Sequence, residues 1–237
     1  MIVQEICEAL QFLANPEKAD FYPRFFKAGK GGYAEGDQFI GVTVPDQRKI
    51  AKEYWQKIPL EALSELLSSP VHEHRHCALL MLVSKFEKSQ EIFEKEAIIQ
   101  FYLNHKEFIN NWDLVDSSCY KILGRHCFEN EDDTLLRLLA AEENLWSKRM
   151  AVVSTMWHVK RGQFEVMKNL VVKNLNHEHD LMHKANGWLL REMGNKNETE
   201  LLDFLSLHYR KMPRTTLRYA IEKLDEQLRQ DFLKGRR

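Results

Sequence analysis

Short helical segments recur along this chain at a nearly constant spacing. Segments that begin with basic residues and then turn apolar align on Ala78 in RHCALLML, Ala151 in KRMAVVST and Ala185 in HKANGWLL. The first gap is 73 residues, or two steps, and its midpoint falls on WDLVDSSC; the second gap is 34 residues. A further step reaches Ala220 in LRYAIEKL. A period in the mid-thirties built from two helices is typical of an α-solenoid of HEAT-like or TPR-like repeats.

The remaining pattern is also helical. Apolar residues recur at three- and four-residue spacing in LEALSELLSS, DDTLLRLLAAEE and FEVMKNLVVKNL, and no useful alternating strand pattern occurs. Several of the 10 glycines bunch in residues 28–41, which indicates one long loop. A helix is expected to follow, with Thr43 as its cap and Pro45 in its first turn. We therefore predict an all-α superhelix of HEAT-like repeats, forming a single domain over residues 1–237.

The composition indicates a folded protein without a membrane span. No stretch approaches the roughly 20 apolar residues that a span needs, and MIVQEICEALQFL has acids where a signal peptide needs positive charge. We expect this segment to be an amphipathic first helix and the protein to be cytoplasmic. Cys7, Cys77, Cys119 and Cys127 form no CxxC pair and lie in apolar helical patterns. Buried, reduced thiols are the expectation.

The net charge of −1 hides an asymmetry along the chain. Residues 1–143 hold 16 Lys and Arg against 24 Asp and Glu, whereas residues 144–237 hold 18 against 11. A chain polarised in this way can present a basic surface while its total charge stays near zero. The composition therefore permits a polyanionic partner without requiring one.

In a helical-repeat array, every second helix lines the concave wall. The segments at 112–123, 148–160, 183–193 and 214–224 are equivalent by the period, so their side chains should share one groove. The candidate groove residues are Trp112, Asp116, Lys148, Arg149, Lys184, Trp188, Arg191, Arg214 and Arg218. Trp112 and Asp116 are four residues apart and would share one helix face.

This combination of side chains suits one particular reaction. Lys and Arg along a groove neutralise phosphates, and indole rings offer flat faces to sugars, bases or cations. An N-alkylated purine already carries a positive charge, so it leaves as a neutral base without a general acid. The reaction then needs one placed carboxylate to stabilise the sugar cation, unlike the two carboxylates of ordinary glycosidases.

Four motifs in order resemble one known family. NWDLVDS, LWSKRMAVV, HKANGWLLREMG and MPRTTLRYAIEKL look like the DNA alkylation repair (AlkD-like) family of DNA glycosylases. The resemblance runs from FIGVTVPDQR to about residue 224. It implies a solenoid of HEAT-like repeats that clasps duplex DNA and releases N3- and N7-alkylated purines without flipping the base into a pocket, unlike most glycosylases. It further implies a monofunctional hydrolase with no metal, cofactor or lyase activity. We expect a monomer, because a groove that must close on DNA suits one.

The resemblance also assigns roles by position. Asp116 matches the carboxylate that stabilises the sugar cation and positions water, and Trp112 and Trp188 match the aromatic pair that packs against the deoxyribose. Arg149 matches a basic residue that grips the DNA backbone. The helix start at Thr43 matches a DNA-contacting loop, although the glycine-rich run before it is longer than the family's usual connection.

Plainer interpretations remain beside these roles. Asp116 could be a surface acid, Arg149 could pair with Glu143, and the tryptophans could be packing residues, as we expect for Trp146 and Trp157. The histidines of VHEHRHC and NHEHDLMH have metal-like spacing, but alternate residues on a helix face different ways, so we expect no metal site. The alternative function is a non-catalytic module that binds nucleic acid or protein.

Overall fold

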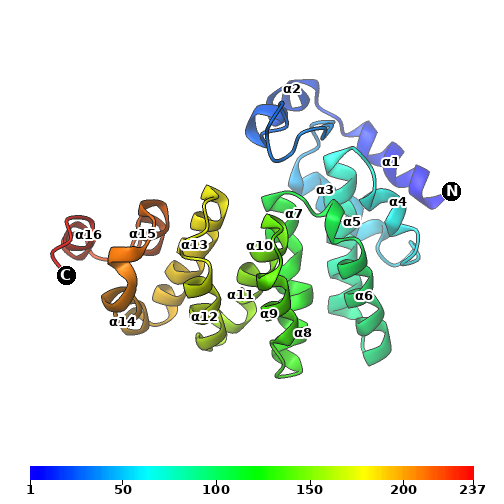
Figure 1. Ribbon diagram of the computed structural model, residues 1–237. Coiled ribbons are helices and arrows are strands. Elements are labelled where there is room, and N and C mark those ends of the chain that lie inside the picture. The colour runs from blue at the N-terminus through cyan, green and yellow to red at the C-terminus, as the bar shows by residue number, and fades with distance from the viewer. The chain divides into compact units, whose positions relative to one another are not determined.

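The computed structural model describes residues 1–237 and is all-α, as predicted (Figure 1). Its only strand-like feature is an isolated parallel bridge between Gln38 and Val71. Backbone contacts divide the chain into two compact units, residues 1–118 and residues 119–237. The single domain and the superhelical course of the whole chain stay predictions.

The first unit is built around one long helix, α5, against which α1, α3, α4 and α6 pack. Apolar and polar residues of α5 are buried together, including Leu79, Met81, His72, Glu73 and Arg75. A helix buried on all sides must satisfy its polar groups within the protein. The helices of this unit are α1 (Ile2–Phe12), α2 (Pro16–Phe25), α3 (Val44–Tyr54), α4 (Leu63–Leu67), α5 (His72–Lys88), α6 (Ile92–Asn104), a 3₁₀ turn (Lys106–Phe108) and α7 (Trp112–Cys119).

Two helix starts show how the sequence sets the ends of these elements. The predicted start of α3 is confirmed, with Thr43 as its N-cap and Pro45 in its first turn. The Thr43 hydroxyl donates to the Asp46 carboxylate at 2.6 Å instead of capping a backbone amide. Helix α2, which the sequence pattern did not indicate, begins where the Asn15 side chain accepts the Lys18 N–H at 3.0 Å. α2 leads directly into the glycine-rich loop.

The glycine-rich loop is confirmed, and it is tied to the first turn of α5. Gln38 donates its N–H to the Pro70 carbonyl and accepts the His72 N–H, both at 2.9 Å. The Glu73 carboxylate accepts the N–H groups of Ile40, at 3.2 Å, and Gly41, at 2.7 Å. These bonds hold the loop at a defined place on the helix that carries His72 and Arg75.

In the second unit each helix packs against helices close to it in the chain. α10 packs against α9 and α13, and α13 packs against α14 and α15, which is the neighbour-to-neighbour packing of helical repeats. The elements are a π-helix (Tyr120–Gly124), α8 (Arg125–Glu129), α9 (Thr134–Ala141), α10 (Leu145–Ser154), α11 (Met156–Val159), α12 (Glu165–Lys173), α13 (Asp180–Lys196), α14 (Glu198–His208), a 3₁₀ turn (Tyr209–Lys211), α15 (Arg214–Ala220) and α16 (Glu226–Leu233). The predicted groove segments of this unit thus lie on α10, α13 and α15, which are in mutual contact through α13.

The contact between α13 and α15 depends on Gly187. A Cβ at this position would lie 2.5 Å from the Tyr219 Cβ and 2.6 Å from the Thr216 carbonyl oxygen. We expect Gly187→Ala to destabilise the protein by about 1–3 kcal/mol, because overpacking outweighs the better helix propensity of alanine. The matched control is Gly194→Ala on the same helix, where the nearest atom is the flexible end of the Leu201 side chain. Urea denaturation measures both, and equal stability of the two variants would contradict the prediction.

Other expectations from the sequence have mixed outcomes. Cys77, Cys119 and Cys127 are buried free thiols, as predicted, but Cys7 is only half-buried. Trp146 is buried, and Trp157 is half-buried, with its indole nitrogen enclosed by the protein. The guanidinium group of Arg161 lies 3.9 Å from the centroid of the Trp157 ring, which is a cation–π contact. None of the helices combines the length and hydrophobicity that crossing a bilayer requires.

Candidate functional site

Trp112 and Asp116 line the same pocket in the first unit. The Asn111 side chain, which is fully buried, accepts the Trp112 N–H at 2.8 Å, where α7 begins. Both Trp112 and Asp116 are half-buried and lie one turn apart, as the sequence predicts. The pocket has a volume of about 370 Å³.

Aromatic rings from α2 form one wall of this pocket. The Phe26 ring stacks on the Trp112 indole with centroids 5.6 Å apart, and the Phe25 ring meets the same indole edge-on at 5.8 Å. Phe39 from the glycine-rich loop stacks on Phe26 at 5.3 Å. The remaining lining residues are Tyr22, Val42, Val44, Gln47, Arg48, His72, Glu73, His76, Asp113 and Ser117. The pocket therefore joins an aromatic wall to a polar interior.

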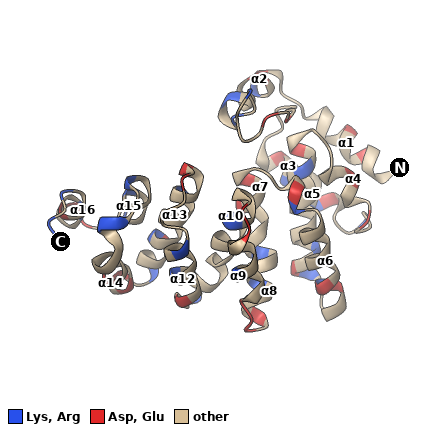
Figure 2. Cartoon of the chain, in the orientation of Figure 1, with Lys and Arg blue, Asp and Glu red and all other residues tan.

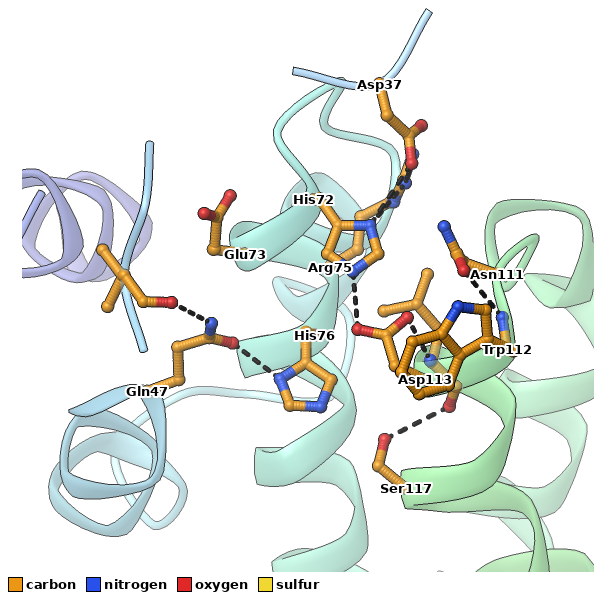
Figure 3. Close-up of polar contacts among 12 residues, drawn as sticks. Asp37, Gln47, His72, Glu73, Arg75, His76, Asn111, Trp112, Asp113 and Ser117 are labelled. Atoms are coloured by element: carbon orange, nitrogen blue, oxygen red, sulfur yellow. Dashed lines mark hydrogen bonds and ion pairs between the residues drawn. The ribbon is translucent and has the colours of Figure 1, made fainter. Parts of the chain in front are cut away.

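A chain of buried charges lies beside Trp112 (Figure 3). The His72 imidazole bridges two carboxylates, with Nε2 2.7 Å from Asp113 Oδ2 and Nδ1 3.2 Å from Asp37 Oδ2. Arg75 donates to the same Asp37 oxygen at 2.5 Å. The side chains of His72, Asp37 and Arg75 are 3%, 5% and 6% exposed. This charge chain, Asp37, His72, Arg75 and Asp113, links the glycine-rich loop, α5 and the first turn of α7.

The charge chain shifts the protonation of its members. Burial favours the neutral form of His72, but the carboxylates of Asp113 and Asp37 outweigh burial and raise the pKa of His72 to about 9. For Asp113 and Asp37, burial acts to raise the pKa, and hydrogen bonds and charge from His72, with Arg75 at Asp37, lower it overall. At neutral pH the chain thus holds two carboxylates and two cations.

The other histidines of VHEHRHC have separate partners. His76 Nδ1 lies 2.6 Å from the Gln47 side-chain oxygen, and His74 Nδ1 lies 3.0 Å from the Ser69 hydroxyl. No group of three or more His, Cys, Asp or Glu side chains is close enough to hold a metal ion. Each histidine of this run therefore makes a different contact within the first unit.

The predicted residues of α13 and α15 lie in the second unit. Lys184 Nζ is 2.8 Å from Asp180, and the Trp188 indole N–H donates to Glu192 at 3.2 Å. Arg191 forms an ion pair with Glu222. Of the predicted cations on α15, the exposed Arg214 donates to the Leu233 carbonyl at 3.1 Å, and Arg218 is exposed on the same face one turn away. Acidic side chains of this unit thus form ion pairs with Lys184 and Arg191.

Arg149 and Lys148 lie on α10. Lys148 is half-buried, whereas Arg149 is only 4% exposed and donates to the Leu181 carbonyl at the start of α13. Arg149 therefore holds two helices together in this unit. The contact of Arg149 with the DNA backbone stays a prediction, as do the DNA contacts of the other cations and of Thr43.

Comparison with known proteins decides the family. The family model described as DNA alkylation repair enzyme matches residues 6–224 of the chain. The chain belongs to the DNA alkylation repair enzyme family. The fold also resembles the solved structure of a predicted DNA alkylation repair enzyme from Enterococcus faecalis, with a TM-score of 0.69 and 19% identity over 92% of this chain and 99% of that chain. No curated protein matches the sequence.

Sequence reasoning missed three parts of the site in this DNA alkylation repair family member. The aromatic wall of α2 was missed, although Phe25 and Phe26 stand together in FYPRFF. The bridge from His72 to Asp113 was missed because the two residues are 41 positions apart. Asp37 lies in a loop whose place could not be predicted; its one signal was an acid within a run of glycines.

Proposed function

We propose that the protein is a DNA glycosylase that hydrolyses the N-glycosidic bond of cationic N3- or N7-alkylated purines in duplex DNA, without flipping the base. The observation that carries the proposal is the placement of Asp116 and Trp112 in one pocket with an aromatic wall. Membership of the DNA alkylation repair enzyme family supports it.

The proposed reaction follows from the charge of the substrate. The bond between the sugar C1′ and the purine nitrogen breaks, and its electron pair passes to the purine, which departs as a neutral base. The sugar is left with oxocarbenium character. The Asp116 carboxylate stabilises this positive charge and directs a water molecule to C1′. Proton loss from that water leaves an abasic site.

The aromatic residues are proposed to hold the sugar. An indole presents a flat apolar face, and packing of a deoxyribose against Trp112 would exclude water from the developing charge and strengthen its attraction to Asp116. Trp188 is proposed to contact the deoxyribose as well, and Arg149, Lys148, Lys184, Arg191, Arg214, Arg218 and Thr43 to contact the DNA backbone. No cofactor takes part in the proposed reaction.

Incubation with damaged duplex DNA tests this function. We expect the wild type to release the base from duplexes that carry a single 7-methylguanine or a single 3-methyladenine, and to leave an undamaged duplex intact. Heating in alkali then converts each abasic site into a strand break. A break without alkali would contradict the monofunctional reaction, because it would indicate lyase activity.

The same experiment addresses the alternative function. Tight duplex binding without base release from either lesion would contradict the glycosylase and favour a non-catalytic binding module. A carboxylate in a groove that faces phosphates opposes DNA binding unless it serves another purpose. This is why Asp116 favours the enzyme over the module.

A further inference from the structure

Three basic side chains surround a glycine-lined hollow at the end of α2. Arg24 lies in the last turn of the helix, and Lys27 and Lys30 follow in the glycine-rich loop. With Pro23 and Gly29, Gly31 and Gly32, they line a hollow of about 630 Å³. The Glu35 carboxylate lies next to it and accepts the Gly31 N–H at 2.8 Å. Figure 2 shows these blue segments on α2 and the loop after it. We name this feature the cationic hollow.

The cationic hollow stands out from the charge of its unit. Residues 1–118 carry 13 Lys and Arg against 18 Asp and Glu, but residues 21–33 carry three cations and no acid. Two other exposed lysines of the unit pair with acids, Lys49 with Asp46 at 2.8 Å and Lys57 with Glu53 at 3.6 Å. Arg24, Lys27 and Lys30 are exposed, and their side chains make no hydrogen bond or ion pair. Unopposed like charges repel each other, and a bound anion would relieve this repulsion.

The backbone of the loop gives the hollow a defined shape. Lys27 has a positive φ of 58°, which is unusual for a residue with a side chain. A Cβ on residue 32 would lie 1.8 Å from the Lys27 carbonyl oxygen, so the turn closes only around Gly32. At Gly29 and Gly31, by contrast, the space around the Cβ position is open. A partner can therefore approach the backbone at Gly29, between the two lysines, whereas the Gly31 N–H is already bonded to the Glu35 carboxylate.

The hollow is held in place relative to the candidate site. α2 contacts Trp112 through Phe25 and Phe26, and the loop is bound to α5 through Gln38 and Glu73. A ligand in the hollow would thus be held at a set distance from Trp112 and Asp116. A long partner with regularly spaced negative charges would match this arrangement better than a single small anion.

We propose that the cationic hollow binds backbone phosphates of duplex DNA, next to the nucleotide at Trp112 and Asp116. This inference rests on the proposed function and adds a second contact region to it. Lysine ammonium groups reach phosphates as point charges on flexible stems, so the contact contributes affinity without reading the base sequence. Arg24, in the last turn of α2, is the third cation of the hollow.

The salt dependence of DNA binding tests the proposal. Binding of undamaged duplex is measured by fluorescence anisotropy between about 50 and 200 mM salt for the wild type and for Lys27→Gln/Lys30→Gln. We expect the slope of log K against log[salt] to become shallower by about 2 in the variant, because each lost phosphate contact removes about 0.9. The matched control, Lys52→Gln/Lys88→Gln, removes the same charge from other exposed positions of the unit and should leave the slope nearly unchanged. Equal slopes for the wild type and the hollow variant would overturn the proposal.

Gly32→Ala tests the shape of the hollow with all charges kept. A methyl group at this position must displace the Lys27 backbone, so we expect weaker duplex binding than in the wild type, with the helix content seen by circular dichroism unchanged. Duplex binding with wild-type affinity in this variant would contradict the proposal that the shape of the hollow contributes to DNA binding. Binding and base release are measured separately, so the two proposals can fail independently. If the wild type binds duplex DNA but releases no base, the proposed function is contradicted and the hollow is not. If the wild type releases the base but the lysine variant keeps the wild-type salt slope, the hollow is contradicted and the proposed function is not.

Discussion

An Asp116→Asn variant is expected to release 7-methylguanine about 10²- to 10³-fold more slowly than the wild type, which is the usual cost of removing one preorganised charge from a transition state. Asparagine has nearly the same shape as aspartate, so the half-buried position should tolerate it. Duplex binding should be at least as tight as in the wild type, because the carboxylate no longer repels phosphates. Single-turnover base release and anisotropy measure the two quantities.

The control for this variant is Asp203→Asn, which removes an exposed carboxylate from α14 and should leave base release unchanged. Base release by Asp116→Asn at the wild-type rate would remove Asp116 from the mechanism. A parallel loss of binding and base release would instead indicate damage to the pocket.

The second large effect is expected at His72. This imidazole is buried between Asp113 and Asp37, so its removal leaves the Asp113 carboxylate without its cation. Loss of one partner of a buried ion pair costs about 3–5 kcal/mol, and we expect His72→Ala to lower the free energy of unfolding by this amount in urea denaturation. His74→Ala is the matched control on the same helix. It removes the contacts of His74 with the Ser69 hydroxyl and the Cys7 thiol, for which we expect a loss of about 1–2 kcal/mol. Equal losses in the two variants would contradict a special role for His72.

The pH dependence of stability should carry the signature of His72. Its pKa is raised from 6.5 to about 9 in the folded protein, so the native state binds this proton more tightly than the unfolded chain. The contribution of His72 is fully present below pH 6.5 and is lost as the pH rises through about 9. The stability difference between the wild type and His72→Ala should therefore shrink across this range. A constant difference would contradict the buried imidazolium.

The two carboxylates of the charge chain affect stability at the acidic end of the pH scale. The pKa values of Asp37 and Asp113 are lowered on folding, so their contribution is present above their unfolded pKa and disappears as the pH falls through the folded values. Burial raises the pKa of Glu73, which lies close to His72, and this is why the comparison uses the difference between the wild type and His72→Ala.

The parts of the fold that follow from local spacing could be predicted from the sequence. The helical period identified α5, α10, α13 and α15 as the recurring helices, and the cap at Thr43 with Pro45 gave the start of α3. The four-residue spacing of Trp112 and Asp116 placed both on one face of α7. These features depend on residues within one or two turns of each other, where backbone geometry leaves few alternatives.

The parts that depend on distant residues could not be predicted. Nothing local indicates that Asp37 and Asp113 meet at His72, because each pairing needs the loop and α7 to be placed first. The role of Arg149 is a similar case. Its sequence position suggests a free cation, but in the fold its side chain is buried and donates to the Leu181 carbonyl. Counting charges along a chain does not tell which of them neighbouring groups already satisfy.

Each of His72, Glu73 and His76 has its own buried partner, and this limits which substitutions the segment can accept during evolution. Replacement of His72 by an apolar residue leaves buried acids behind, so the exchange becomes tolerable only when Asp113 changes as well and Asp37 remains with Arg75. Glu73 serves the loop backbone and His76 serves Gln47, so neither can substitute for His72. Among related sequences, positions 72 and 113 should therefore vary together or remain unchanged together, whereas position 37 should follow position 75 and position 74 should vary independently of them.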